Sequence, residues 1–185
     1  DRETLAKLQG SKLQPKRNHV NKFEKSYEPR TELLTKKHYE EVEKMLDDWV
    51  GEKHETTTGT IAHERQVVEE AFQHFEELGL RGLMLYANDK PAAFTFGAPI
   101  NGNTFDVMVE KGETKYEGVF AAVNKYFVQS LPEQYTLINR EEDLGIEGLR
   151  KSKLSYQPSR ILDKWFAIEK ESDEFNLFEQ IQKER

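Results

Sequence analysis

The chain has 185 residues and a formal net charge of −7, and its 11 Phe, 7 Tyr and 2 Trp are enough aromatic residues to build the core of one domain. It has no Cys, which excludes disulfides and thiolate metal sites, and no apolar run approaches the roughly 20 residues that a transmembrane helix needs. The composition therefore favours a cytoplasmic protein without a transmembrane segment.

The charge is unevenly distributed along the chain. Six basic residues and one acid, Glu24, lie between Leu5 and Lys25, so this segment carries +5 and the rest of the chain carries −12. We expect residues 1–26 to form a basic helical arm that attracts tRNA or anionic lipid headgroups, the latter placing the protein at the periphery of a membrane. The acidic remainder should repel polyanions.

The first part of the chain is predicted to be mainly helical. Apolar spacing and capping residues predict helices over 2–9, 15–23, 35–50 and 61–78, with an extended stretch at 27–33 and a polar, Thr-rich loop at 51–60. Three short strands are then expected at 83–86, 92–97 and 104–110. Turn signals at Asn88-Asp89 and Asn101-Gly102 separate them, so they should be antiparallel.

The last part alternates helices and strands. We predict a helix over 116–131, a strand at 135–139, a helix over 143–154, a strand at 160–169 and a terminal helix at 172–183. The fold class is therefore α/β (α+β), with a mixed, mostly antiparallel sheet flanked by helices. This is the element order of the GNAT acyltransferase fold, although periodicity alone leaves other α/β folds open. The expected division is an arm at 1–26, a domain at 27–170 and a C-terminal helix at 171–185.

Three stretches carry a resemblance to a known family. They are K-L-Q-P-K-R-N-H-V-N-K-F at residues 12–23, F-T-F-G at 94–97 and Y-T-L-I-N-R-E-E-D-L-G-I-E-G-L-R-K-S-K-L-S-Y at 135–156. Together they resemble an uncharacterised bacterial family that is grouped with the C-terminal domain of phosphatidylglycerol lysyltransferase. The resemblance implies a GNAT-like fold akin to that of the Fem-type aminoacyltransferases. It also implies that the chain is a C-terminal half, whose partner is a GNAT-like N-terminal half of the same protein.

The resemblance assigns no substrate, and our first hypothesis is an acyl- or aminoacyl-transferase-like domain, with acyl-CoA or aminoacyl-tRNA as the candidate donor and a lipid or an amine as the candidate acceptor. The residues leave a second function open, a non-catalytic GNAT-fold domain that binds a ligand or nucleic acid. Where GNAT enzymes hold the pyrophosphate of acyl-CoA, this chain has E-K-G-E-T-K-Y-E-G at residues 110–118. Its three Glu side chains would repel a pyrophosphate, so the sequence disfavours acyl-CoA.

The candidate site residues lie in the two longer motifs. Residues 139–143 follow a predicted strand and precede a helix, a place where ligands gather in α/β sheets. The predicted catalytic residues are Asp143 and Glu141 as proton acceptors and Tyr156, to which the resemblance assigns the role of general acid. The predicted substrate-binding residues are Lys16, Arg17, Asn18, His19, Asn139, Arg140, Arg150 and Lys153.

Structural roles compete with these functional ones. Asp143 is placed to cap the following helix, Arg140 to join an ion-pair network and Tyr156 to pack in the core. Gly145 and Gly148 weaken that helix, which predicts close backbone packing against it. No metal site is predicted, because the five His residues are scattered and no His-Glu-x-x-His pattern occurs. No nucleophile motif of the Gly-x-Ser-x-Gly type is present either.

Overall fold

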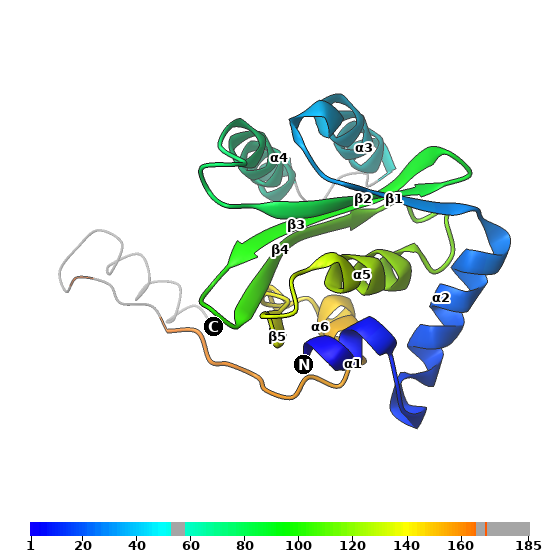
Figure 1. The fold of residues 1–185 in the computed structure, drawn as a ribbon. Helices are drawn as coiled ribbons and strands as arrows, with labels where there is room; N and C mark the ends of the chain where they lie inside the picture. The colour runs from blue at the N-terminus through cyan, green and yellow to red at the C-terminus, as the bar shows by residue number, and fades with distance from the viewer. Residues whose placement is uncertain (53–57, 166–168, 170–185) are drawn as a thin grey trace.

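The computed structural model describes residues 1–52, 58–165 and 169, and within them five strands form one sheet (Figure 1). The strands follow the order of the chain across the sheet: β1 (Pro29–Leu33), β2 (Arg81–Ala87), β3 (Lys90–Pro99), β4 (Thr104–Gly112) and β5 (Leu137–Asn139). The first four are antiparallel to their neighbours, and β5 pairs in parallel with β4. The predicted mixed, mostly antiparallel sheet is confirmed.

The turns between the central strands follow from local residue chemistry. Asn88 and Asp89 both have positive φ, at 51° and 59°, and these residue types tolerate that conformation in a tight hairpin. The second turn is held by the Asn101 side chain, whose Oδ1 accepts hydrogen bonds from the backbone of Asn103 and Thr104 at 3.0 Å. Both hairpins were predicted from the sequence.

Helices cover both faces of the sheet (Figure 1). The short η2 turn (Lys36–His38), α3 (Tyr39–Glu52) and α4 (Thr58–Gln73) cover one face, where a core cluster includes Val42, Phe72 and Phe96. The other face carries α5 (Val119–Ser130), whose cluster includes Phe105 and Phe127. Outside α5 lie α1 (Arg2–Lys7), η1 (Ser11–Leu13), α2 (Gln14–Ser26) and α6 (Glu147–Leu154). No helix of the described residues has the length and apolar character needed to cross a membrane.

The predicted basic arm packs against the sheet domain. Leu5, Leu8 and Val20 from this segment are buried with Val128 of α5 and with Tyr156 in a third apolar cluster. The backbone N–H of Arg2 donates to the carbonyl of Thr136 at 2.9 Å. Apolar burial and main-chain bonding therefore fix α1 and α2 beside α5.

Strand β4 has an irregularity in its middle. Gly97 of β3 pairs with Val107, whereas the preceding residue, Phe96, pairs with Val109, so Met108 is an extra residue in β4. Such a bulge bends the strand and interrupts its ladder. The pairing of β4 with β5 ends just before it, at Asp106 and Asn139, while β4 continues to Gly112. The pairing of the two strands thus stops before the bulge, because β5 itself ends at Asn139.

Several predicted elements differ from the structure near the C-terminus. The helix expected to begin at Asp143 begins at Glu147, because Gly145 has a positive φ of 74° and places a turn before it. Residues 160–165 form no strand, and the remainder of the predicted strand except residue 169 lies outside the described residues, as does the terminal helix at 172–183. Helix α4 begins three residues before the predicted Ile61 and ends at Gln73.

Candidate functional site

A charged side chain from the long motif lies where β5 ends beside β4. Arg140 follows β5 directly, and its Nη2 donates to Glu110 Oε1 of β4 at 3.0 Å. Glu110 also accepts a hydrogen bond from Asn124 Nδ2 of α5 at 3.1 Å. The side chains of Arg140 and Glu110 are only 19% and 14% exposed, so this is a largely buried pair. This place, where β5 ends beside β4, is called the wedge below, and it is therefore polar.

Two cationic groups lie over the ring of Tyr156, and a third, Lys153, bonds to the backbone beside Arg140. The Arg140 guanidinium lies 4.4 Å and the Lys16 ammonium 4.2 Å from the centre of the Tyr156 ring. From α6, Lys153 Nζ donates to the carbonyl of Arg140 and, at 2.6 Å, to that of Glu142. Tyr156 itself is 6% exposed. The structure thus brings together four of the predicted site residues, which come from both motifs.

The pKa values in this cluster reflect burial and an excess of positive charge. Burial and, after it, the charge of Arg140 lower the pKa of both the Lys16 and the Lys153 ammonium. Burial raises the pKa of the Tyr156 phenol to about 12, so it stays protonated at neutral pH. Arg140 Nε and Nη1 are buried without a hydrogen-bond partner among the described residues. Two of the three nitrogens of this guanidinium therefore lack an acceptor within the described part of the chain.

A carboxyl pair lies at the end of β5. Burial first, and then the neighbouring Glu141, raise the pKa of Asp106 to about 7, while the hydrogen bond from Asp106 lowers the pKa of Glu141. The Asn139 side chain bonds to Asp106, and Lys164 Nζ donates to Glu141 Oε2 at 3.0 Å. The two carboxyl groups share one proton near neutral pH.

Asp106 was missed by the sequence reasoning. The available signal was an acidic residue between Phe105 and Val107 in a predicted strand. Of the predicted residues, Asn139 and Glu141 join this pair rather than the Tyr156 cluster.

Other predicted site residues have structural roles. Arg17 donates to the carbonyls of Leu8 and Gly10 and to the Gln14 side chain, which ties the end of α1 to α2. Asn18 is exposed and accepts a hydrogen bond from Gln14 at 2.8 Å. These residues are therefore directed away from the cation cluster.

The prediction that Asp143 caps α6 is wrong. The N-cap residue is Ile146, which has no side-chain cap, while Asp143 Oδ1 accepts from the Gly145 N–H at 2.9 Å. Arg150 pairs with Asp143, and its own side chain is 57% exposed. The predicted close packing at the two glycines is wrong as well, because a Cβ at Gly145 or Gly148 would meet nothing within 4 Å.

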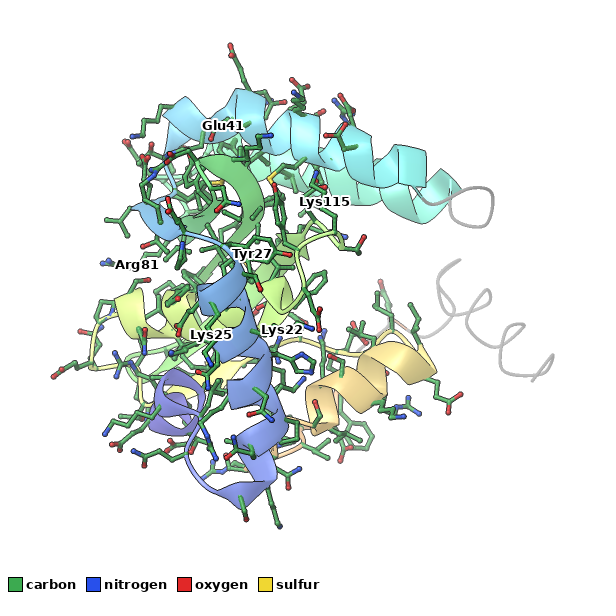
Figure 2. The ribbon with its side chains drawn as sticks, turned by 90° about the vertical axis from the view of Figure 1, so that its right-hand side faces the viewer. Lys22, Lys25, Tyr27, Glu41, Arg81 and Lys115 are labelled. Carbon is green, nitrogen blue, oxygen red and sulfur yellow. The ribbon has the colours of Figure 1, made fainter. Side chains whose placement is uncertain are left out.

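Helix α2 closes the position where a pyrophosphate would be expected. Gly118 begins α5 with φ of 89°, and a Cβ at this residue would overlap the backbone carbonyl of His19. The Lys22 ammonium pairs with Glu117 at 2.6 Å, and the backbone N–H of Glu117 donates to the Tyr27 hydroxyl at 3.3 Å. Figure 2 shows α2 running across this side of the molecule, with Lys22 and Tyr27 along it. The N-terminus of α5 is therefore covered by protein.

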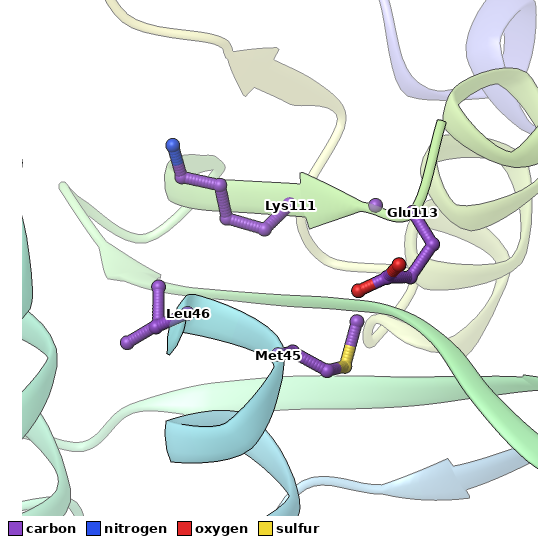
Figure 3. Close-up of a pocket in the computed structure, with 5 residues that line it drawn as sticks. Met45, Leu46, Lys111 and Glu113 are labelled. Atoms are coloured by element: carbon purple, nitrogen blue, oxygen red, sulfur yellow. The ribbon is translucent and has the colours of Figure 1, made fainter. Parts of the chain in front are cut away.

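Two cavities lie away from these groups. One, of about 10 Å³, lies between α3 and the end of β4 and has room for about one water molecule (Figure 3). Its lining residues are Met45, Leu46, Lys111, Gly112 and Glu113. The other lies between η2, α3 and α4 and includes Tyr39 and Phe72. Neither includes a residue of the cation cluster, which is closed around Tyr156.

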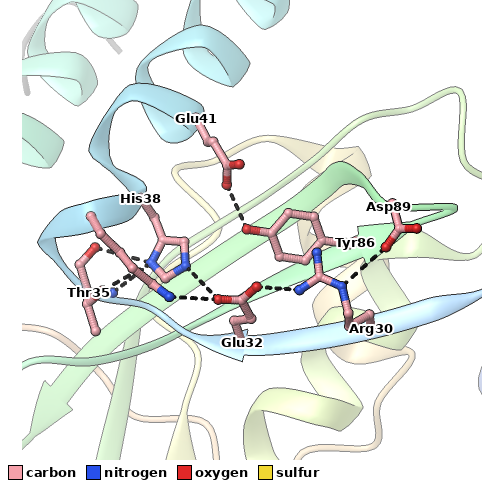
Figure 4. Close-up of polar contacts among 8 residues, drawn as sticks. Arg30, Glu32, Thr35, His38, Glu41, Tyr86 and Asp89 are labelled. Carbon is pink, nitrogen blue, oxygen red and sulfur yellow. Dashed lines mark hydrogen bonds and ion pairs between the residues drawn. The ribbon is translucent and has the colours of Figure 1, made fainter.

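A separate polar network lies on β1, at the opposite edge of the sheet (Figure 4). Glu32 accepts from Lys37 at 2.9 Å and pairs with Arg30, and these contacts hold the pKa of its carboxyl down at about 2. The Tyr86 hydroxyl donates to Glu41 at 2.7 Å. The two cations here, Arg30 and Lys37, are each paired with a carboxylate, so this network is a set of ion pairs along the strand edge. Among the described residues, no group of three or more His, Asp or Glu side chains could hold a metal ion.

The chain belongs to the phosphatidylglycerol lysyltransferase C-terminal family, whose model matches residues 1–168. It is 45% identical to a conserved protein of unknown function from Bacteroides thetaiotaomicron VPI-5482, with a TM-score of 0.83 over 86% of this chain and 54% of that one. It is 24% identical over 160 residues to an uncharacterized protein of Mycoplasmoides gallisepticum, covering 85% of this chain and 51% of that protein. The chain thus spans about half the length of these relatives.

The fold is also found in an acetyltransferase-type structure. A possible acetyltransferase from Clostridium difficile 630 matches with a TM-score of 0.57 over 76% of this chain and 97% of that chain, at 11% identity. At that identity the likeness concerns the fold alone. It confirms the GNAT-like acyltransferase fold that the element order and the motifs predicted.

Proposed function

We propose that this domain is an acyl- or aminoacyl-transferase whose donor is aminoacyl-tRNA rather than acyl-CoA, and whose acceptor is an amine or a lipid hydroxyl. The observation that carries the proposal is the early end of β5 at Asn139, which leaves β4 to continue past its bulge at Met108. Beyond Asp106, the edge of β4 that faces β5 has no strand beside it in the described part of the chain. We propose that backbone N–H groups on this edge hold an acyl carbonyl.

The closed end of α5 supports a donor other than acyl-CoA. Free N–H groups at a helix N-terminus are the usual partner of a pyrophosphate, and here the carbonyl of His19 lies against that position. Two lysines at this position are already engaged by carboxylates of the same loop, Lys115 by Glu113 and Lys22 by Glu117. A donor attached through a ribose ester needs no pyrophosphate subsite, which favours aminoacyl-tRNA.

The proton transfers can be assigned to two groups at the wedge. In the proposed reaction the acceptor nitrogen or oxygen bonds to the acyl carbon and loses a proton, and the ribose oxygen leaves with a proton. Tyr156, whose pKa is raised to about 12, is the proton donor to the leaving oxygen. Asp106, with a pKa of about 7 and Glu141 beside it, is the proton acceptor in place of Asp143.

Partners follow from the family and the length of its members. Because the relatives are about twice as long, we propose that a GNAT-like N-terminal half adjoins this domain and contributes to the site. The exposed basic residues that remain on the arm, Lys12 and Lys25 among them, are proposed to contact tRNA or anionic lipid headgroups at a membrane surface.

Donor binding tests the proposal. Calorimetry with acetyl-CoA and filter binding with charged tRNA are run on the full chain at the same salt concentration. We expect charged tRNA to bind and acetyl-CoA to show no micromolar affinity. Micromolar acetyl-CoA binding, or tRNA binding that is unchanged when the aminoacyl group is removed, would contradict it.

A second function is favoured by one observation. Arg140 occupies the wedge and Tyr156 is 6% exposed, so the cluster is closed in this conformation. A non-catalytic domain that binds a ligand at the same residues is the alternative. It predicts ligand binding without transfer to any amine or lipid hydroxyl, which a turnover assay with labelled donor separates from the first function.

A further inference from the structure

The cation cluster around Tyr156 is assembled from three separate parts of the chain. Lys16 comes from α2, Arg140 from the segment after β5 and Lys153 from α6. The two lysines lie close enough to Arg140 for its charge to lower the pKa of both ammonium groups. Bringing like charges together in a half-buried place is unfavourable unless an anion compensates them. The arrangement therefore calls for a compensating negative group.

The negative groups present do not balance the three cations. Glu110 is the carboxylate that bonds to Arg140 within the cluster. Two further carboxylates near Lys153 are already held by other cations, Glu141 by Lys164 and Asp143 by Arg150. Three positive charges against one negative charge leave an excess of two.

The hydrogen-bond inventory leads to the same conclusion. Arg140 Nη2 bonds to Glu110, but Nε and Nη1 are buried without an acceptor among the described residues. Buried guanidinium donors that lack an acceptor are rare and carry a desolvation penalty. An oxygen-rich anion beside Arg140 would satisfy donors that the protein leaves unpaired.

We propose that Lys16, Arg140 and Lys153 form a binding site for a single phosphate group, with Tyr156 as its floor. A phosphate monoester carries between −1.5 and −2 charges near pH 7 and would match the excess of two. A phosphodiester or a carboxylate carries one and would leave a positive charge uncompensated.

The site lies beside the wedge between β4 and β5, so a bound phosphate would anchor one end of a substrate whose reacting group lies at the bulge. That use of the phosphate rests on the proposed transfer reaction, but the binding itself does not. Binding is therefore measured without turnover, and a failure of one proposal is distinguishable from a failure of the other.

The test measures affinity for small phosphates by calorimetry on the full chain. The ligands are glycerol 3-phosphate as a monoester, glycerophosphoglycerol as a diester, inorganic phosphate and acetate. We expect the monoester to bind in a saturable way, more tightly than the diester, and acetate not to bind. Equal affinity for inorganic phosphate and the monoester would locate recognition in the phosphate alone, and weaker binding of inorganic phosphate would show that the ester group contributes; both support a phosphate site.

Matched lysine variants distinguish the site from general surface attraction. Lys16→Gln and Lys153→Gln should each weaken the monoester by about tenfold or more, the effect of losing one charge-assisted hydrogen bond. Lys151→Gln on α6 and Lys90→Gln at the start of β3 each remove an exposed charge outside the cluster and should leave the affinity unchanged. These lysine variants avoid the buried Arg140, whose removal would threaten folding.

A spectroscopic measurement completes the test. Phosphate bound at the site should raise the pKa of the Lys16 and Lys153 ammonium groups, which NMR titration of labelled lysine follows directly. The proposal is overturned if the monoester does not bind, if the control variants lose as much affinity as the site variants, or if neither lysine pKa changes at saturation. The cluster would then be a purely structural set of stacked and hydrogen-bonded cations.

Discussion

Replacing Asp106 with Asn should change how the stability of the protein depends on pH. Burial and the neighbouring Glu141 raise the pKa of Asp106 from 3.8 to about 7. Because the folded-state pKa is the higher one, the folded protein holds this proton more tightly than the unfolded chain. The stability that the proton brings is fully present below about pH 4 and is lost as the pH rises through about 7.

The size of the effect follows from the shift. A shift of about three units corresponds to roughly 4 kcal/mol at 1.36 kcal/mol per unit, which is an upper limit. Asp106 is only half-buried and shares its proton with Glu141, so solvent screening reduces this to roughly 1–2 kcal/mol. Asn cannot ionise, and its NH₂ group can replace the shared proton by donating to Glu141.

Urea unfolding of the wild type and of Asp106→Asn at pH 5 and at pH 8 measures the difference. The unfolding free energy of the wild type should fall relative to that of the variant by roughly 1–2 kcal/mol between these two values. Glu142→Gln, which removes a neighbouring carboxylate that also binds Lys164, is the control and should show no such change. A difference between wild type and Asp106→Asn that is constant with pH, or that grows in favour of the wild type, would refute the shared-proton pair.

Two further comparisons test the structural roles of Gly118 and of the Arg140–Glu110 pair. Gly118→Ala should destabilise by roughly 2–4 kcal/mol, because its Cβ would overlap the His19 carbonyl at a positive φ, whereas Gly148→Ala in α6 should stabilise by about 0.5–1 kcal/mol. Arg140→Ala should destabilise by roughly 3 kcal/mol because it leaves Glu110 buried, while Asp143→Ala should have little effect on stability. Denaturant melts check both, and a stable Arg140→Ala with an unstable Asp143→Ala would reverse the assigned roles.

The sheet could be predicted because its signals are local. Turn residues such as Asn88 and Asn101 fix hairpins within a few residues, and apolar strands adjoin them, β2 and β3 buried almost throughout and β4 with partly alternating burial. The element order then limited the fold to a mixed sheet with helices on both faces. Most element boundaries differ by a few residues, as expected where helix ends depend on tertiary contacts.

The site could be predicted only in part, because its contacts join distant residues. Residues from the two longer motifs meet at Tyr156, yet nothing local indicates that Lys16 reaches Tyr156 while Arg17, one residue later, turns back to the end of α1. The helical rotation between successive residues decides this, together with the packing of α2. Asp143 failed as a cap because the positive φ of Gly145 delays the helix, which the residue types alone did not reveal.

Helix α2 makes two contacts that bear on anion binding by this domain. Its His19 carbonyl covers the N-terminus of α5, and Lys16, one turn earlier on the same helix, joins Arg140 at Tyr156. Both contacts depend on α2 lying where Val20 and Phe23 are buried against the domain. A single apolar interface therefore holds both the His19 carbonyl against the start of α5 and the Lys16 ammonium beside Tyr156.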